Sequence, residues 1–233
     1  MIMAQAPSSS PKPAVRATPD RKALAKVGES VRARLARDPS VYRVPVDSAE
    51  IFAIGDFLDA RECARLIELI DDVARPSDLT RDIEGDYRTS YSGDVDRDDP
   101  VVRTVERRLY DLIGIDASWG ETIQGQRYHP GQQFKEHCDW FDTDQAYWAK
   151  ESATGGQRSW TGMVYLNTVE EGGVTEFTRI GVTIPPQPGA LLLWNNNLPD
   201  GTVNWDTMHA ALPVVRGAKY VITKWFRSRR WGM

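Results

Sequence analysis

The stretch Gln126-Arg-Tyr-His-Pro-Gly-Gln-Gln-Phe-Lys-Glu-His-Cys-Asp-Trp140 lies at the start of the half of the chain that determines the fold class. From about residue 120 onwards, short runs rich in β-branched and aromatic residues alternate with Gly, Pro and Asn. Many short strands separated by turn residues are typical of a β-sandwich or barrel. The predicted strands are 122–128, 162–167, 174–178, 190–194 and 220–226.

Helical patterns come before these strands. A short strand is predicted over 51–54, and a capping box at 59–62 predicts a helix whose buried face carries Cys63, Leu66, Ile67, Ile70 and Val73. A further helix is predicted from Asp99-Pro100 to Gly114. Because helices precede strands instead of alternating with them, we expect an α+β, mainly β protein. The predicted architecture is a double-stranded β-helix (jelly roll) buttressed by N-terminal helices.

The N-terminal part divides into two segments. Residues 1–18 are rich in Pro, Ser and Ala and are predicted to be a disordered tail. Residues 19–48 are predicted to form a basic amphipathic helix and a connection, with Thr18 as the N-cap and Pro19 as the first helical residue. The jelly-roll domain is predicted to span 49–233.

Composition limits the range of partners. The chain has a net charge of −4, and its 41% apolar and 27% charged residues are ordinary for a soluble protein. The acidic balance argues against nucleic acid as a partner. No apolar run is long enough to span a membrane, and the two cysteines indicate no disulfide framework. We therefore expect a cytoplasmic protein without membrane association.

The candidate metal ligands begin with His137 and Asp139. On an extended strand, residues two apart project from the same face. Only three histidines occur in the chain, and His129 is followed by a strand-breaking Pro-Gly pair, so His209 is the expected third ligand. Two imidazoles and one carboxylate suit an iron(II) that keeps open positions, whereas a closed structural zinc site would need further Cys or His ligands.

Lys219 follows His209 by ten residues. A turn near Val214 would place the two on paired strands with their side chains on one face. A lysine near a metal ion is costly unless an anion lies between them. The second carboxylate of a chelating dicarboxylic oxoacid would be such an anion.

At this point the sequence resembles the prolyl 4-hydroxylase-like branch of the iron(II)/2-oxoglutarate-dependent dioxygenases. The resemblance covers residues 50 to 227. The matching elements are Arg88-Thr-Ser90, Tyr128-x-x-Gly131-x-x-Phe134-x-x-His137-x-Asp139, Tyr165-Leu-Asn167, Gly172-Gly-Val-Thr-Glu-Phe177, Pro188-Gly189, and His209-Ala-x-x-Pro-Val214 leading to Gly217-x-Lys219.

The resemblance implies a role for each matching residue. His137, Asp139 and His209 would hold iron(II), and Lys219 would bind the far carboxylate of 2-oxoglutarate with help from the hydroxyls of Tyr128 and Thr175. On the substrate side, the matching residues are Arg88, Trp194 and Asn195. Halogenases related to this family lack the carboxylate ligand, so the presence of Asp139 favours hydroxylation.

The expected activity is hydroxylation of an unactivated C–H bond by dioxygen and 2-oxoglutarate, with release of succinate and CO2 and with ascorbate as a conceivable reductant. The expected substrate is a prolyl residue in a peptide or protein. Two alternatives stay open, namely a hydroxylase of a free amino acid, carrier-bound peptide or other small metabolite, and a non-enzymatic jelly-roll module. An acidic loop, 78–99, and an insert, 142–158, are candidate lids.

Overall fold

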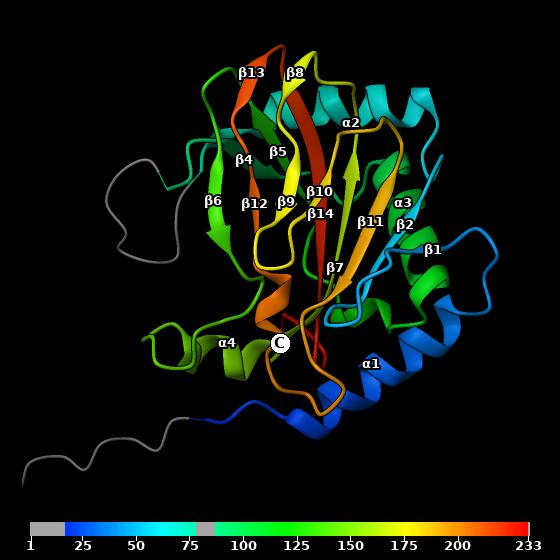
Figure 1. Ribbon diagram of the computed structural model, residues 1–233, viewed down its shortest axis with the longest axis vertical. Helices are drawn as coiled ribbons and strands as arrows, with labels where there is room; N and C mark the ends of the chain where they lie inside the picture. The colour runs from blue at the N-terminus through cyan, green and yellow to red at the C-terminus, as the bar shows by residue number, and fades with distance from the viewer. Residues whose placement is uncertain (1–16, 78–86, 233) are drawn as a thin grey trace, which may run out of the picture.

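The computed structural model describes residues 17–77 and 87–232. Most of the predicted tail and the first part of the acidic loop lie outside these ranges. Two layers of antiparallel strands make up the body of the protein, and helices cover the larger layer (Figure 1). The helices are α1 (Arg21–Leu35), α2 (Ala60–Val73), α3 (Pro100–Ile113) and α4 (Trp148–Thr154), with short 3-10 turns η1 (Ala117–Trp119) and η2 (Trp205–Thr207).

The large sheet has the strand order β1-β2-β11-β7-β14-β5-β4-β3. In that order its strands are Tyr42–Arg43, Ile51–Ile54, Leu191–Asn195, Arg158–Tyr165, Lys219–Arg227, Gln124–Tyr128, Tyr91–Asp94 and Arg75–Pro76. The small sheet contains β10 (Val182–Ile184), β9 (Thr175–Phe177), β12 (His209–Ala211) and β6 (Phe134–His137), while β13 (Val214–Arg216) pairs with β8 (Glu171–Gly172). The predicted jelly roll with N-terminal helices is confirmed.

Strand alternation separates the interior into two cores. On β11, Leu191 and Leu193 pack beneath helices α1 to α3, whereas Leu192 and Trp194 point between the two sheets. Both sets are fully buried, which explains why the segment reads as a continuous apolar run. The core between the sheets surrounds the candidate site.

Capping residues determine where the helices start. The Asp59 carboxylate accepts from the backbone N–H groups of Arg61 and Glu62, and the Glu62 carboxylate accepts from the Asp59 N–H, as the predicted capping box requires. The prediction for α1 is wrong by two residues. Asp20 is the N-cap and Thr18 is not, because the Asp20 carboxylate satisfies the free N–H of Ala23.

Both candidate lids contain regular structure. Tyr91–Asp94, within the predicted loop 78–99, forms strand β4 beside β5, so this part of the segment is sheet and not loop. In the insert 142–158, α4 buries Trp148, whose indole N–H donates to the Ala17 carbonyl.

The prediction of which residues of α2 face the core is partly wrong, because Leu69 is buried while Ile67 and Val73 are partly exposed. Among the described residues, no helix combines the length and apolar character needed to cross a membrane.

Candidate active site

The three predicted metal ligands converge at one end of the jelly roll. His137 ends β6, and His209 begins the neighbouring strand β12 directly opposite it. Asp139 lies just beyond the end of β6. The Nε2 atom of His137 is 4.0 Å from Oδ1 of Asp139, and Nε2 of His209 is 4.0 Å from Oδ2. One ligand atom from each residue lies within 4.8 Å of the other two, a spacing compact enough for one metal ion.

Both imidazoles are held in the tautomer that a metal requires. Nδ1 of His137 lies 2.8 Å from the carbonyl oxygen of Lys135, and Nδ1 of His209 lies 2.9 Å from that of Thr207. Because a carbonyl oxygen can only accept, each Nδ1 carries a proton, which leaves Nε2 as the nitrogen available to bind a metal. Burial, with a smaller contribution from His209, lowers the pKa of His137 to about 3, so this imidazole is neutral at pH 7.

Asp139 is oriented by a buried chain of hydrogen bonds. The hydroxyl of Thr161, on β7, lies 2.8 Å from Oδ2 of Asp139, and Nδ2 of Asn196 lies 3.0 Å from the same hydroxyl oxygen. A carboxylate can only accept, so Thr161 donates to Asp139 and Asn196 donates to Thr161. Burial acts to raise the pKa of Asp139, but the two histidines and Arg158 hold that pKa below its usual value. Asp139 is therefore anionic at neutral pH, the state in which a carboxylate can bind a metal.

Removing the Thr161 hydroxyl should weaken the metal site. We expect Thr161→Val to lower metal affinity by about 10- to 100-fold, the usual effect of losing a hydrogen bond to a metal ligand. The matched variant Thr161→Ser keeps the hydroxyl and should stay within a few-fold of the parent. Titration of the metal-free protein with iron(II) under anaerobic conditions measures both affinities. Equal affinities for the valine and serine variants would contradict this role.

A buried lysine lies in the same interior. Lys219 is 1% exposed, and its ammonium contacts Thr175 Oγ1 at 3.3 Å and the ring centroids of Tyr128 and Tyr165 at 5.5 Å each. No carboxylate among the described residues forms an ion pair with it. Burial lowers the pKa of Lys219 to about 7. A buried cation without a counter-ion is costly, so this group is prepared for an anion.

The prediction that His209 and Lys219 lie on paired strands is wrong. His209 lies on β12 in the small sheet, whereas Lys219 begins β14 in the large sheet and pairs with Tyr128 of β5. The intervening segment does not close a hairpin, because Val214 of β13 pairs with Gly172 of β8. The two side chains instead line the same inner cavity from opposite sheets.

Two hydroxyl residues predicted to help bind an oxoacid also line the inner cavity. Thr175, on β9, receives a hydrogen bond from the Tyr165 hydroxyl at 2.8 Å as well as the contact from Lys219. Tyr128 is 2% exposed, and its hydroxyl donates to Gln126 Oε1 at 2.7 Å. Burial raises the pKa of Tyr128, which keeps its hydroxyl protonated as a donor.

The three predicted substrate residues occupy different environments. Trp194 lines the inner cavity, packs edge-on against His209 at 4.9 Å, and has a buried indole N–H without a partner among the described residues. Asn195 points the other way on β11 and donates to Glu50, which differs from the expected position in the cavity wall. Arg88 lies over the Phe134 ring at 4.7 Å and donates to Gln124.

Sequence reasoning missed Thr161 and Tyr165. Both lie on β7, four residues apart, so strand alternation directs both toward the core between the sheets. Tyr165 was already part of the Tyr165-Leu-Asn167 match. Because every second residue of a strand lies on the same face, Thr161, four residues earlier, could have been found from Tyr165. Asn196 has no comparable signal, because it follows β11 in irregular backbone.

The donor set fits an iron(II) ion and a dicarboxylate. Two imidazole nitrogens and one carboxylate on one side of the ion leave positions open for further ligands. Lys219 supplies the positive charge for a second carboxylate. The inner cavity is small, about 30 Å³, and is lined by the triad together with Lys219, Thr175 and Tyr128.

Comparison with known proteins gives consistent matches. A model described as the 2OG-Fe(II) oxygenase superfamily matches residues 123–227. Prolyl 4-hydroxylase subunit alpha-1 from Homo sapiens is 33% identical in an alignment of length 193 that covers 78% of this chain and 35% of that protein. Probable prolyl 4-hydroxylase 3 from Arabidopsis thaliana is 30% identical in an alignment of length 199 that covers 75% of this chain and 68% of that protein.

A solved structure is also similar. The viral collagen prolyl hydroxylase of Paramecium Bursaria Chlorella virus-1, in its complex with 2OG, has a TM-score of 0.61 and 26% identity. The match covers 76% of this chain and 95% of the viral chain. By contrast, this chain spans about a third of the length of the human relative.

Proposed function

Because the chain belongs to the 2OG-Fe(II) oxygenase superfamily, we propose that it is an iron(II)- and 2-oxoglutarate-dependent hydroxylase acting on a prolyl residue of a peptide or protein. The observation that carries the proposal is the buried Lys219 ammonium, which has no counter-ion within residues 17–77 and 87–232 and lies in the cavity that the His137, Asp139 and His209 triad also lines. Prolyl substrates are supported by the names of the relatives.

In the proposed mechanism, the protein binds and orients the reactants. His137, Asp139 and His209 would hold iron(II), which when bound supplies the chemistry that couples hydroxylation of a C–H bond to conversion of 2-oxoglutarate and dioxygen into succinate and CO2. Lys219 binds the distal carboxylate, and Tyr128 and Thr175 line the same cavity beside its ammonium. The aromatic wall of Trp194 and Phe177 keeps water away from the triad.

The proposal is tested by turnover with defined substrates. Incubation with iron(II), 2-oxoglutarate and a proline-containing peptide should produce succinate in amounts matching a peptide product heavier by one oxygen atom. Free proline and other amino acids form the comparison arm. Succinate formation that does not depend on iron(II), or oxidation of free amino acids alone, would contradict a peptidyl prolyl hydroxylase.

The affinity for 2-oxoglutarate should fall as pH rises. The dianion binds the protonated ammonium of Lys219, whose pKa of about 7 in the free protein means that the proton is lost as pH increases through neutrality. We expect a nearly constant Kd below about pH 6 and a Kd that rises above pH 7 by up to tenfold per pH unit. Isothermal titration between pH 6 and 9 measures this. Lys219→Arg is the matched control, because a guanidinium stays charged over that range; a flat wild-type profile would contradict the assignment.

A further inference from the structure

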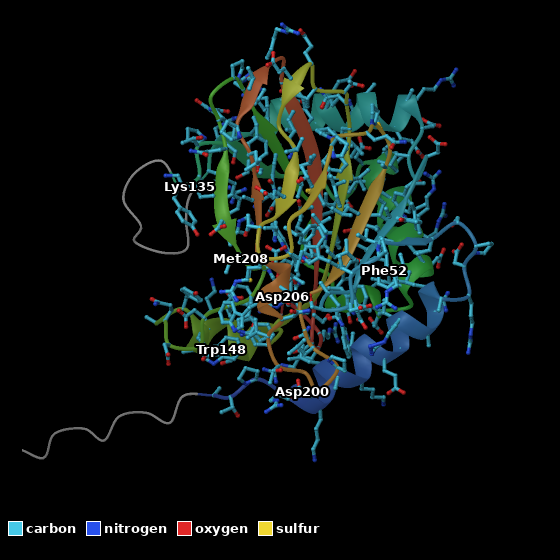
Figure 2. The ribbon with its side chains drawn as sticks, viewed as in Figure 1. Phe52, Lys135, Trp148, Asp200, Asp206 and Met208 are labelled. Atoms are coloured by element: carbon cyan, nitrogen blue, oxygen red, sulfur yellow. The ribbon has the colours of Figure 1, made fainter. Side chains whose placement is uncertain are left out.

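A larger cavity of about 530 Å³ opens beside the metal ligands. His137 lines both this cavity, which we call the entrance groove, and the inner cavity, so the groove leads to the proposed metal. Its walls are formed by the segment after β6, the segment leading into β12, and the residues just before α1. Met208 lines the groove, and Figure 2 shows this residue between Lys135 above it and Trp148 below it.

The groove has an aromatic wall suited to an extended chain. Trp140, Trp205 and Tyr87 line it together with the thioether of Met208. Trp205 is 49% exposed, an unusual amount for such a large apolar side chain. Indole and phenol faces attract cations as well as apolar groups.

The charge of the groove is negative. Three carboxylates line it, from Glu136, Asp142 and Asp144, against one guanidinium, from Arg21. Arg21 is already paired with Asp200. Within the described part of the chain, no lysine or arginine forms an ion pair with Glu136 or Asp142.

We infer that the entrance groove binds a lysine or arginine side chain next to the prolyl residue, so that the preferred substrate is a basic, proline-containing peptide. The inference rests on the proposed function. Because His137 lines the groove, a peptide whose prolyl C–H bond lies at the proposed metal can extend through the groove. A sphere of 530 Å³ is about 10 Å across, which is the length of roughly three extended residues. The cation therefore falls within about three residues of the target proline.

The test compares peptides that differ only in charge. Fluorescently labelled peptides with lysine, norleucine or glutamate on both sides of one proline are titrated with the full chain, and polarisation gives each Kd. We expect the lysine peptide to bind roughly 5- to 30-fold more tightly than the norleucine peptide, from the combined ion-pair and cation–π contributions. The glutamate peptide should bind most weakly, and the differences should shrink as salt concentration rises.

A double variant and a matched control identify the carboxylates that cause the preference for the lysine peptide. In the double variant Glu136→Gln/Asp142→Asn, the preference for lysine over norleucine should fall to about threefold or less. Asp72→Asn, an exposed carboxylate on α2 outside the groove, is the matched control and should keep the full preference. Equal Kd values for the lysine and norleucine peptides, a preference that survives the double variant, tight binding of the glutamate peptide, or no binding of any peptide would each overturn the inference.

The same peptides separate this inference from the proposed function. A lysine preference in binding without any succinate formation would contradict the hydroxylase and leave the groove assignment intact. Hydroxylation of all three peptides with equal Kd values would support the hydroxylase and overturn the groove assignment.

Discussion

Lys219→Ala is expected to raise the Kd for 2-oxoglutarate by about 30- to 4,000-fold, which corresponds to the 2–5 kcal/mol lost when one partner of a buried charge pair is removed. The ammonium is fully buried and has no acidic partner among the described residues, so its removal leaves the second carboxylate of the cosubstrate buried without this counter-charge. Isothermal titration of the metal-loaded, oxygen-free protein measures the change.

Lys219→Ala should weaken the binding of 2-oxoglutarate but not the binding of iron(II). Lys219 lies on the sheet opposite β6 and β12, so iron(II) affinity of the alanine variant should stay within a few-fold of the parent. Lys219→Arg keeps a cation and should recover part of the affinity, although the cavity is narrow. An alanine variant that binds 2-oxoglutarate as well as the parent would show that another group holds the second carboxylate.

Asp139→Ala is expected to reduce peptide-dependent succinate formation by at least about 1,000-fold, equivalent to roughly 4 kcal/mol. The carboxylate is the one anionic member of the triad, and its loss leaves only the two imidazole ligands. The reduction should exceed that for Thr161→Val, because that variant removes only a hydrogen bond to the ligand and not the ligand itself.

A thermal readout separates loss of the metal from loss of the fold. Iron(II) should raise the Tm of the parent protein and leave the Tm of Asp139→Ala nearly unchanged, since a ligand stabilises only a protein that binds it. Asp72→Ala, which removes an exposed carboxylate on α2, should behave like the parent in both assays. If Asp139→Ala kept parental turnover, the triad would not be the catalytic metal site.

Local signals in the sequence were reliable because they act over a few residues. The Asp59 capping box and the Asp99-Pro100 start of α3 each depend on hydrogen bonds within one helical turn, and both occur as predicted. The same reasoning misplaced the start of α1, where Asp20 competes with Thr18 for the free N–H groups of the first turn. Such errors arise when two residues close together in the sequence can each serve as the cap.

The identity of the candidate ligands also followed from the sequence. With three histidines in the chain, one of them beside a Pro-Gly break, His209 was the remaining choice to join His137 and Asp139. Chemistry then restricted what two imidazoles, a carboxylate and a lysine can bind together. No tertiary information was needed for either step.

What the tertiary structure alone decided is the set of contacts between strands distant in the sequence. It placed Lys219 on the sheet opposite His209, placed Thr161 and Asn196 behind Asp139, and turned Asn195 away from the cavity. Strand pairing joins segments tens of residues apart, and its register depends on which faces the whole sheet buries, so no local pattern specifies it. The sequence by itself determined which residues could form the site; the packing of two sheets determined how they face one another.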